Sequence, residues 1–247
     1  MFFILLSPHL FSQDVLRHHI NIIYVDNQII SDIVSIKDGD ALPVVYLNQP
    51  DFSDLIVNEK KTKFIDFILP AILIEKEKIK TVYHYVLDNF DNLYLNDKTK
   101  PLYDYCACDT AYELLLCFTE QPTSIIIAQA AIESGWGTSR FFLEGFNLFG
   151  IHTYNNDDQT LKAQNSSRVY VKKYSSVSES ISHYLRTLAR AGAYSEFRKQ
   201  RANSNDVMHI INYLTNYSER REVYIDDIES IIEYNKLCQY DTLTINH

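Results

Sequence analysis

One carboxylate in the middle of the chain occupies an unusual sequence position. Glu133 ends the apolar run IIIAQAAIE, and Ser134-Gly135-Trp136-Gly137 follows at once, with the only tryptophan and two of the six glycines. The backbone dipole disfavours negative charge at the C-terminus of a helix, and a neighbouring indole would remove part of the carboxylate's hydration. Both effects raise the pKa of Glu133, so this stretch predicts a carboxyl group that keeps its proton near neutral pH.

A protonated carboxyl group of this kind suits general acid catalysis on a glycosidic bond. It can donate its proton to the leaving oxygen, as the acid of lysozyme does. The flanking glycines let the backbone turn sharply and let a substrate come close to it. The residues alone also allow a solvated carboxylate at a helix end, with Gly135 as an ordinary C-terminal cap.

The elements that must hold Glu133 follow from the hydrophobic periodicity. Residues 20–46 are rich in β-branched side chains around Asp26-Asn27, which predicts a hairpin. The alternation at residues 168–172 predicts a small hairpin or flap. Helical periodicity predicts a first helix from about residue 58, with a kink at Pro70, and a later helix that is capped by Thr123 or Ser124 and ends at Glu133. The other predicted helices lie at 81–95, 109–120, 176–190, 206–217 and 222–237. The expected fold is mainly α with some β: a helical domain, a small β flap and a β-leaning N-terminal segment.

Composition narrows the functional classes. The net charge of -9 argues against a nucleic-acid partner, because phosphates favour a basic surface. The apolar stretch at residues 1–12 is too short to span a bilayer and fits either a degenerate export signal or a first strand. The eight histidines show no metal-ligand spacing, so we expect no metal and no cofactor.

The four cysteines lack the paired C-x-x-C spacing of a zinc site. We expect free buried thiols. The alternative is a link from Cys106 or Cys108 to Cys238 in an oxidising compartment.

The segment AQAAIESGWGTSRFFLEGFNLFGIH resembles the core motif of Bax-type bacterial glucosaminidases of glycoside hydrolase family 73, which cleave peptidoglycan. The shared pattern is A-Q-A-A-x-E-S-G-W-G, a short helix, then N-L-F-G-I. Three further segments are similar to family elements in the same order: VNEKKTKFIDFILPAILIEKEKI, VKKYSSVSESISHYLRTLARAGAYSEFRKQRA and LTNYSERREVYIDDIESIIEYNKL. The resemblance covers residues 43–237.

The resemblance implies a lysozyme-like helical domain that acts on peptidoglycan glycan strands. The expected reaction is hydrolysis of the β-1,4 bond on the reducing side of N-acetylglucosamine. The implied organisation is an N-terminal segment at 1–57, the glucosaminidase domain at 58–238 and a tail at 239–247. Because the substrate lies outside the cytoplasmic membrane, the resemblance also implies export, to the periplasm or the cell envelope, without a stable membrane span.

The resemblance also assigns roles to individual residues. Glu133 becomes the general acid, and Tyr224 matches the family's tyrosine near it, with an ordinary core tyrosine as the alternative. A second carboxylate is expected in the flap, where only Asp157 and Asp158 are available; a solvated turn is the alternative there. The expected substrate-binding residues are Trp136 packed against the acid (or else a core aromatic), Asn147 (or else a turn former), Phe149, Gly150, Tyr174 and Tyr217.

Two rival functions remain open from the sequence. A lytic transglycosylase or muramidase acting on the neighbouring bond can use a single catalytic glutamate, which fits the weak second acid. A catalytically inactive wall-binding protein is the other alternative, although glycan binding alone does not require a protonatable acid.

Overall fold

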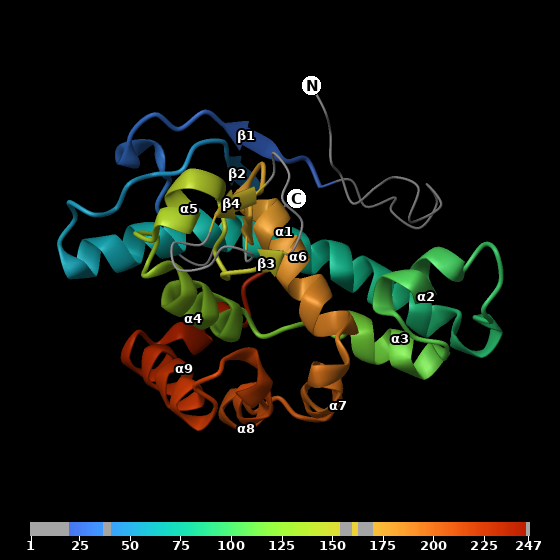
Figure 1. The fold of residues 1–247 in the computed structure, drawn as a ribbon. Coiled ribbons are helices and arrows are strands. Elements are labelled where there is room, and N and C mark those ends of the chain that lie inside the picture. The colour runs from blue at the N-terminus through green and yellow to red at the C-terminus, as the bar shows by residue number, and fades with distance from the viewer. Residues whose placement is uncertain (1–19, 37–40, 154–159, 163–169, 246–247) are drawn as a thin grey trace.

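The computed structural model describes residues 20–36, 41–153, 160–162 and 170–245. It is mainly helical with two small sheets, as expected from the sequence (Figure 1). The candidate export signal at residues 1–12 lies outside the described residues. Within the described ranges, no one helix combines the length and apolarity of a membrane span; the bent pair of helices at Ala111–Phe118 and Thr123–Ser134 meets that test on length and composition alone.

Helix α1 (Val57–Asp88) is the longest helix among the described residues. Every residue from Phe64 to Lys76 is buried, including the charged residues Asp66, Glu75 and Lys76, so neighbouring elements cover this stretch on all sides. Pro70 lies within this helix without ending it. The separate helix predicted at 81–95 is wrong, because α1 continues unbroken to Asp88.

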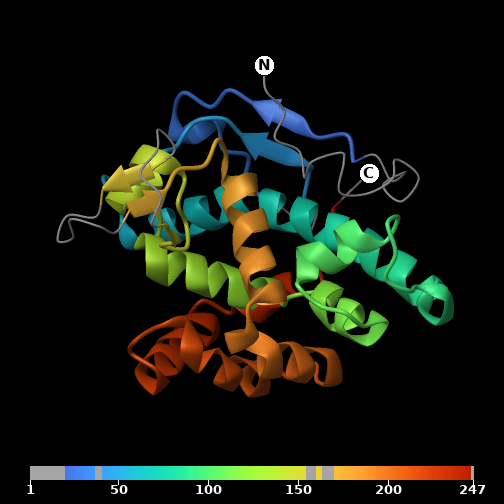
Figure 2. The same cartoon turned by 45° about the vertical axis from the view of Figure 1, so that its right-hand side comes forward.

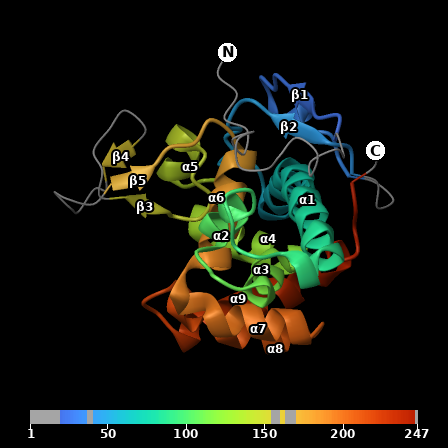
Figure 3. The same ribbon diagram turned by 90° about the vertical axis from the view of Figure 1, so that its right-hand side faces the viewer.

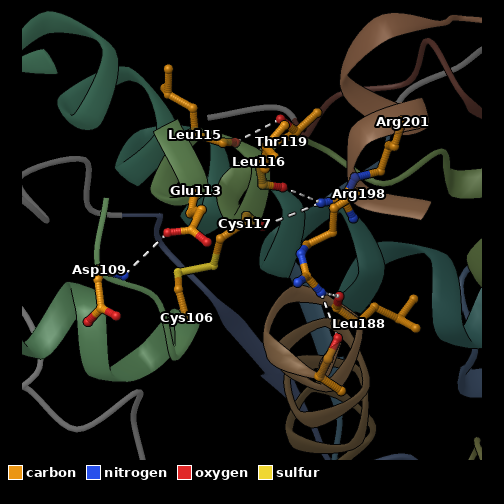
Figure 4. The surroundings of a disulfide bond; sticks show 11 residues. Cys106, Asp109, Glu113, Leu115, Leu116, Cys117, Thr119, Leu188, Arg198 and Arg201 are labelled. Atoms are coloured by element: carbon orange, nitrogen blue, oxygen red, sulfur yellow. Dashed lines mark hydrogen bonds between the residues drawn. A yellow bond between two sulfur atoms is a disulfide. The ribbon is translucent and has the colours of Figure 1, made fainter. Parts of the chain in front are cut away.

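Two short helices pack on the C-terminal half of α1. They are α2 (Lys100–Cys106), which the periodicity did not reveal, and α3 (Ala111–Phe118). Ala107 adopts a left-handed conformation with φ of 52° and reverses the chain between them. The reversal brings Cys106 and Cys117 together in a disulfide bond, with their Cα atoms 5.9 Å apart (Figure 4). The expectation of free thiols is therefore wrong for these two cysteines, while Cys108 and Cys238 are free.

Helix α4 (Thr123–Ser134) is almost wholly buried and packs against α1 on one side and α9 (Glu222–Tyr234) on the other. The sequence predicted a cap from Thr123 or Ser124 at its N-terminus, but neither side chain provides one. Instead, the Asp241 carboxylate accepts hydrogen bonds from the Ser124 backbone nitrogen at 2.7 Å and from the Ser124 hydroxyl at 2.9 Å. This cap comes from 117 residues further along the chain, where local periodicity gives no sign of it.

The remaining helices surround this centre. Figure 2 shows α6 (Val177–Arg190) crossing α1, with the C-terminal helices beneath it. The predicted helix at 206–217 is split into an α-helical and a 3-10 part. In chain order the other helices are η2 (Phe90–Asn92), α5 (Arg140–Gly145), η3 (Gly192–Tyr194), α7 (Ser195–Asn203), α8 (Val207–Ile211), η4 (Asn212–Tyr217) and η5 (Leu237–Tyr240).

The N-terminal sheet differs from the predicted hairpin. Strands β1 (Ile23–Val25) and β2 (Val44–Tyr46) pair in parallel, not antiparallel. The predicted turn at Asp26-Asn27 does not form, because the buried Asn27 side chain bonds to a distant segment. Its amide nitrogen donates to the Asn48 carbonyl at 2.9 Å, and its amide oxygen accepts from the Asn48 nitrogen at 3.0 Å. Asn27 thus ties together the chain beyond the ends of both strands, and the connection passes through η1 (Ile30–Asp32).

The second sheet confirms the small flap. Strands β3 (His152–Thr153), β5 (Tyr170–Lys172) and β4 (Thr160–Lys162) pair antiparallel in that spatial order. Figure 3 shows this sheet beside α5, on the opposite side of the molecule from α1. One large core joins α1, α4, α6 and α9 to β2, and a second, smaller core lies between α1, α2 and α3.

Candidate functional site

Helix α4 delivers Glu133 to the surface through a tightly organised turn. Gly135 is left-handed with φ of 58°, which confirms the predicted C-terminal position. The Ser134 hydroxyl donates to the Ala130 carbonyl at 2.6 Å and accepts from the Gly137 nitrogen at 3.0 Å. A side chain at Gly137 would meet the Phe52 ring at 2.7 Å, and its φ is +77°, so only glycine fits there.

The surroundings of the Glu133 carboxyl group combine burial with two stabilising partners. Burial raises its pKa, while a hydrogen bond from Tyr224 and the positive charge of Arg220 act in the opposite direction. This confirms the predicted direction of the shift. Gly150 lies alongside, because a Cβ placed on it would be 3.5 Å from Glu133 Oε2. Glu133 and Gly150 both remain partly exposed, so a substrate atom can reach the acid.

Two tyrosines form the wall next to the acid. Tyr224 is only 1% exposed, and its ring stacks on Tyr217 with 5.6 Å between centroids and 7° between planes. The Tyr217 hydroxyl donates to the Phe149 carbonyl at 3.4 Å. The structure thus brings together Glu133, Gly150, Phe149, Tyr217 and Tyr224 from four separate segments.

Asn147 organises the turn that places Gly150. Its buried amide nitrogen donates to the carbonyls of Ile151 at 3.0 Å and Lys172 at 2.9 Å. Its amide oxygen accepts from the backbone nitrogens of Phe149 at 3.3 Å and Ile151 at 3.0 Å. The amide is therefore fully used by the backbone. Asn147 therefore has the contacts of a turn former, which is the alternative to acetamido binding that the sequence left open.

The side chains of Phe149 and Tyr174 are both buried. Phe149 stacks on Tyr184 with centroids 4.0 Å apart, so its carbonyl, not its ring, faces Tyr217. The Tyr174 hydroxyl lies 2.8 Å from His183 Nδ1, and burial lowers the pKa of His183 to about 4. Direct contact of these two rings with a substrate stays a prediction.

The ring of Trp136 meets α1. It packs edge-on against Phe64, with centroids 5.7 Å apart, and the Lys61 ammonium lies 5.0 Å above it. Lys61 also lies 4.7 Å above the Tyr234 ring and donates to Asn235 Oδ1 at 2.9 Å. The contact of Trp136 with the acid stays a prediction, as does the role of Asp157 and Asp158, which lie outside the described residues.

Sequence reasoning missed the polar groups behind Tyr224. Gln129 Nε2 donates to the Tyr224 hydroxyl at 3.1 Å, and the Tyr184 hydroxyl donates to Gln129 Oε1 at 2.5 Å. A signal was present: Gln129 is the one amide in the apolar run and precedes Glu133 by four residues, which places both on one face of a helix. In the part of the chain that is described, no three His, Cys, Asp or Glu side chains gather as metal ligands.

Comparisons with known proteins add the following findings. The family model for mannosyl-glycoprotein endo-beta-N-acetylglucosaminidase matches residues 110–237, a range that includes Glu133, Gly150 and Tyr224. Protein bax of Escherichia coli (strain K12) is 42% identical over 81 residues, which are 33% of this chain and 28% of that protein. The catalytic domain of the autolysin Auto from Listeria monocytogenes matches with a TM-score of 0.41 and 21% identity, over 68% of this chain and 88% of that one.

Proposed function

The chain belongs to the mannosyl-glycoprotein endo-beta-N-acetylglucosaminidase family, and from this premise we propose that it is a peptidoglycan hydrolase. The proposed reaction is cleavage of the β-1,4 bond on the reducing side of N-acetylglucosamine, with Glu133 as the general acid. The observation that carries the proposal is the Glu133 carboxyl group itself: it is partly accessible, its pKa is raised by burial, and it interacts with the Tyr224 hydroxyl.

In the proposed mechanism, the Glu133 proton passes to the glycosidic oxygen as the bond from that oxygen to the anomeric carbon breaks. The departing sugar keeps this proton, and positive charge develops on the ring that remains. The new Glu133 carboxylate is stabilised by the Tyr224 hydroxyl and by Arg220, the two groups that lower its pKa. Water then adds to the anomeric carbon, and its released proton restores the acid.

The group that activates this water has two candidates. Asp157 or Asp158 would act as the second carboxylate in the usual two-acid scheme. A water held by Tyr217 or Tyr224 would serve otherwise. Among the described residues, the charged group that shifts the pKa of Glu133 is Arg220, a cation, and not a second carboxylate.

The environment of Glu133 is also compatible with the rival enzymatic reactions. A lytic transglycosylase needs one acid, because the substrate's own hydroxyl replaces water and forms an anhydro sugar. A muramidase would act on the same neighbouring bond but leave a reducing muramic acid. An inactive wall-binding protein is the third candidate, and the raised pKa of Glu133 argues against it, since binding has no use for a proton donor.

Product analysis separates these functions. Purified sacculi are digested with the wild-type chain and with Glu133→Gln, and the soluble fragments are identified by mass spectrometry. We expect fragments that end in reducing N-acetylglucosamine from the wild type and none from the variant. Anhydro-muramic ends or reducing muramic acid would assign the neighbouring bond, and no release by the wild type would overturn the proposal.

The proposed substrate also fixes the place of action. Peptidoglycan lies outside the cytoplasmic membrane, so the proposal includes export to the periplasm or the cell envelope. Fractionation of cells that express the full chain tests this, with the expectation that the protein leaves the cytoplasm.

A further inference from the structure

An aromatic cluster at the surface lies beside the turn that carries Glu133. Three segments form it: Trp136 comes from the turn after α4, Lys61 from the beginning of α1, and Tyr234 is the last residue of α9. The Lys61 ammonium lies 5.0 Å from the centroid of the Trp136 ring and 4.7 Å from that of the Tyr234 ring. We call these three side chains the aromatic platform.

The core holds one side of the platform in place. The Trp136 ring packs edge-on against the buried Phe64 ring, with centroids 5.7 Å apart. Phe64 follows Lys61 by three residues, so both side chains lie on one face of α1. Trp136 also has a φ of 57°, a left-handed conformation that bulky residues rarely adopt. The indole is therefore fixed by its packing while it remains partly exposed.

The other side of the platform is open to solvent. Tyr234 is 80% exposed, more than any other large hydrophobic side chain in the described ranges. Lys61 lies over one face of its ring, and an exposed fraction this high requires that the opposite face be free. Lys61 Nζ also donates to Asn235 Oδ1 at 2.9 Å, and the Asn235 amide nitrogen donates to the Ile231 carbonyl at 2.8 Å. These bonds tie the lysine to the end of α9.

The charge of Lys61 has no counter-charge among the described residues. Its ammonium contacts two rings and one amide oxygen and pairs with no carboxylate there. An ammonium has three N–H donors, of which Asn235 takes one. Aromatic rings attract a cation but do not neutralise it. In a chain with a net charge of -9, this unpaired cation between two rings suits a ligand that supplies its own anion.

The platform is continuous with the proposed active site. Trp136 follows Glu133 by three residues, so their Cα atoms are at most about 11 Å apart. Tyr234 follows Tyr224 by ten residues, which corresponds to about 15 Å along α9. A ligand that covers both the acid and Tyr234 must therefore be a polymer of several units.

We propose that the aromatic platform is a second binding site for the peptidoglycan strand, next to the site of cleavage. The rings take the apolar faces of the sugar units, since Trp and Tyr combine an apolar face with a polar atom. The Lys61 ammonium pairs with a carboxylate of the peptide stem. The choice of ligand rests on the proposed function, whereas the position of the platform does not.

The first experiment measures binding without cleavage. Glu133→Gln supplies a background that lacks the proton donor, and Tyr234→Ala is added to it. We expect the apparent Kd for purified sacculi, measured by co-sedimentation, to rise by about 3–10-fold. Tyr234→Phe keeps the ring and should keep the Kd. Tyr94→Ala is the matched control, because Tyr94 is 70% exposed and lies between η2 and α2.

The second experiment tests the charge in the same background. Lys61→Met keeps an unbranched side chain but removes the ammonium group. We expect the apparent Kd for sacculi to rise by about 2–5-fold at low salt and to match the background at high salt, where screening weakens the ion pair. Chitin has the β-1,4-linked sugar without carboxylates, so its Kd should not change. Lys98→Met is the control, since it removes the same charge from an exposed lysine elsewhere.

The outcomes separate the platform from the proposed reaction. Unchanged binding of sacculi in both Tyr234→Ala and Lys61→Met would overturn the platform, and equal losses on sacculi and chitin in Lys61→Met would overturn the pairing with a carboxylate. If the wild-type chain releases no fragments from sacculi but Tyr234→Ala weakens binding, the proposed function fails and the platform stands. Release of fragments together with unchanged binding in the variants gives the reverse conclusion.

Discussion

The two cores of this molecule hold their buried tyrosines in different ways. In the second core, the Tyr103 hydroxyl bonds locally to the Leu93 carbonyl, and a disulfide joins α2 to α3. In the main core, the hydroxyls of Tyr184 and Tyr224 both bond to the Gln129 side chain, and Tyr224 also interacts with the partly exposed carboxyl group of Glu133. The difference suggests that the second core serves stability, whereas the main core also serves chemistry.

Arg201 joins the two regions. Its guanidinium group is 7% exposed and donates to the Leu116 and Cys117 carbonyls at the end of α3, as well as to Gln121. Burial lowers the pKa of Arg201 to about 10, which leaves it charged at neutral pH. A charge is therefore buried between the two cores: the guanidinium carbon lies 5.5 Å from the Phe197 ring of the main core, and a guanidinium nitrogen donates to the Cys117 carbonyl of the second core.

The largest effect is expected from Glu133→Gln, which tests whether the two cores have separate roles. This variant keeps the size and an acceptor for Tyr224 but has no proton to donate. We expect the rate of glycan release to fall by about 10²–10⁴-fold while the melting temperature changes little. Glu144→Gln is the control, because Glu144 is exposed and pairs with Arg140, and it should keep the wild-type rate. A large loss of stability in Glu133→Gln would contradict the separation of roles.

The next largest effect is expected at the turn that links the main core to the acid. Gly137→Ala would place a methyl group 2.7 Å from the Phe52 ring at a φ of +77°. We expect a loss of about 2–4 kcal/mol in the free energy of unfolding, measured by urea denaturation. Gly192→Ala is the matched control, since nothing lies within 4 Å of its added methyl group. Equal stability of the two variants would show that the turn is not constrained as described.

The third prediction concerns the second core alone. Cys106→Ser should lower the free energy of unfolding by about 2–3 kcal/mol, because the unfolded chain loses the constraint of a loop with a sequence separation of 11. Glycan release per folded molecule should not change. Cys108→Ser provides the control, because Cys108 is a free thiol. If Cys106→Ser altered the reaction rate of folded protein, the second core would share in the chemistry and the comparison would fail.

The sequence predicted those features that depend on neighbouring residues. The motif around Glu133 predicted the raised pKa and the left-handed Gly135, and both are confirmed. The amphipathic pattern predicted the helix at 176–190 within one residue, and its Ser176 cap is present. The alternation near 168–172 predicted the flap. In each case the signal lies within one turn or one element.

Features that join distant segments escaped prediction. Asp241 caps α4, and Asn27 bonds to Asn48 in place of forming a hairpin turn. The hydrogen bond from Gln129 to the Tyr224 hydroxyl joins residues 95 positions apart, so no local pattern reveals that the two side chains meet. The role of Asn147 could not be decided either, because its carbonyl partner at Lys172 lies 25 residues further along the chain.

The central claim is that the proton on Glu133 performs the cleavage. The most direct test compares two values on the same protein: the pKa of Glu133 from its own ¹³C titration, and the pKa at which kcat/KM on sacculi falls as the pH rises. Burial raises the pKa of Glu133, so the acid stays active up to that value and loses its proton above it. We predict that the two pKa values coincide, above the ordinary glutamate value. A rate that stays constant through the titration of Glu133 would contradict the account.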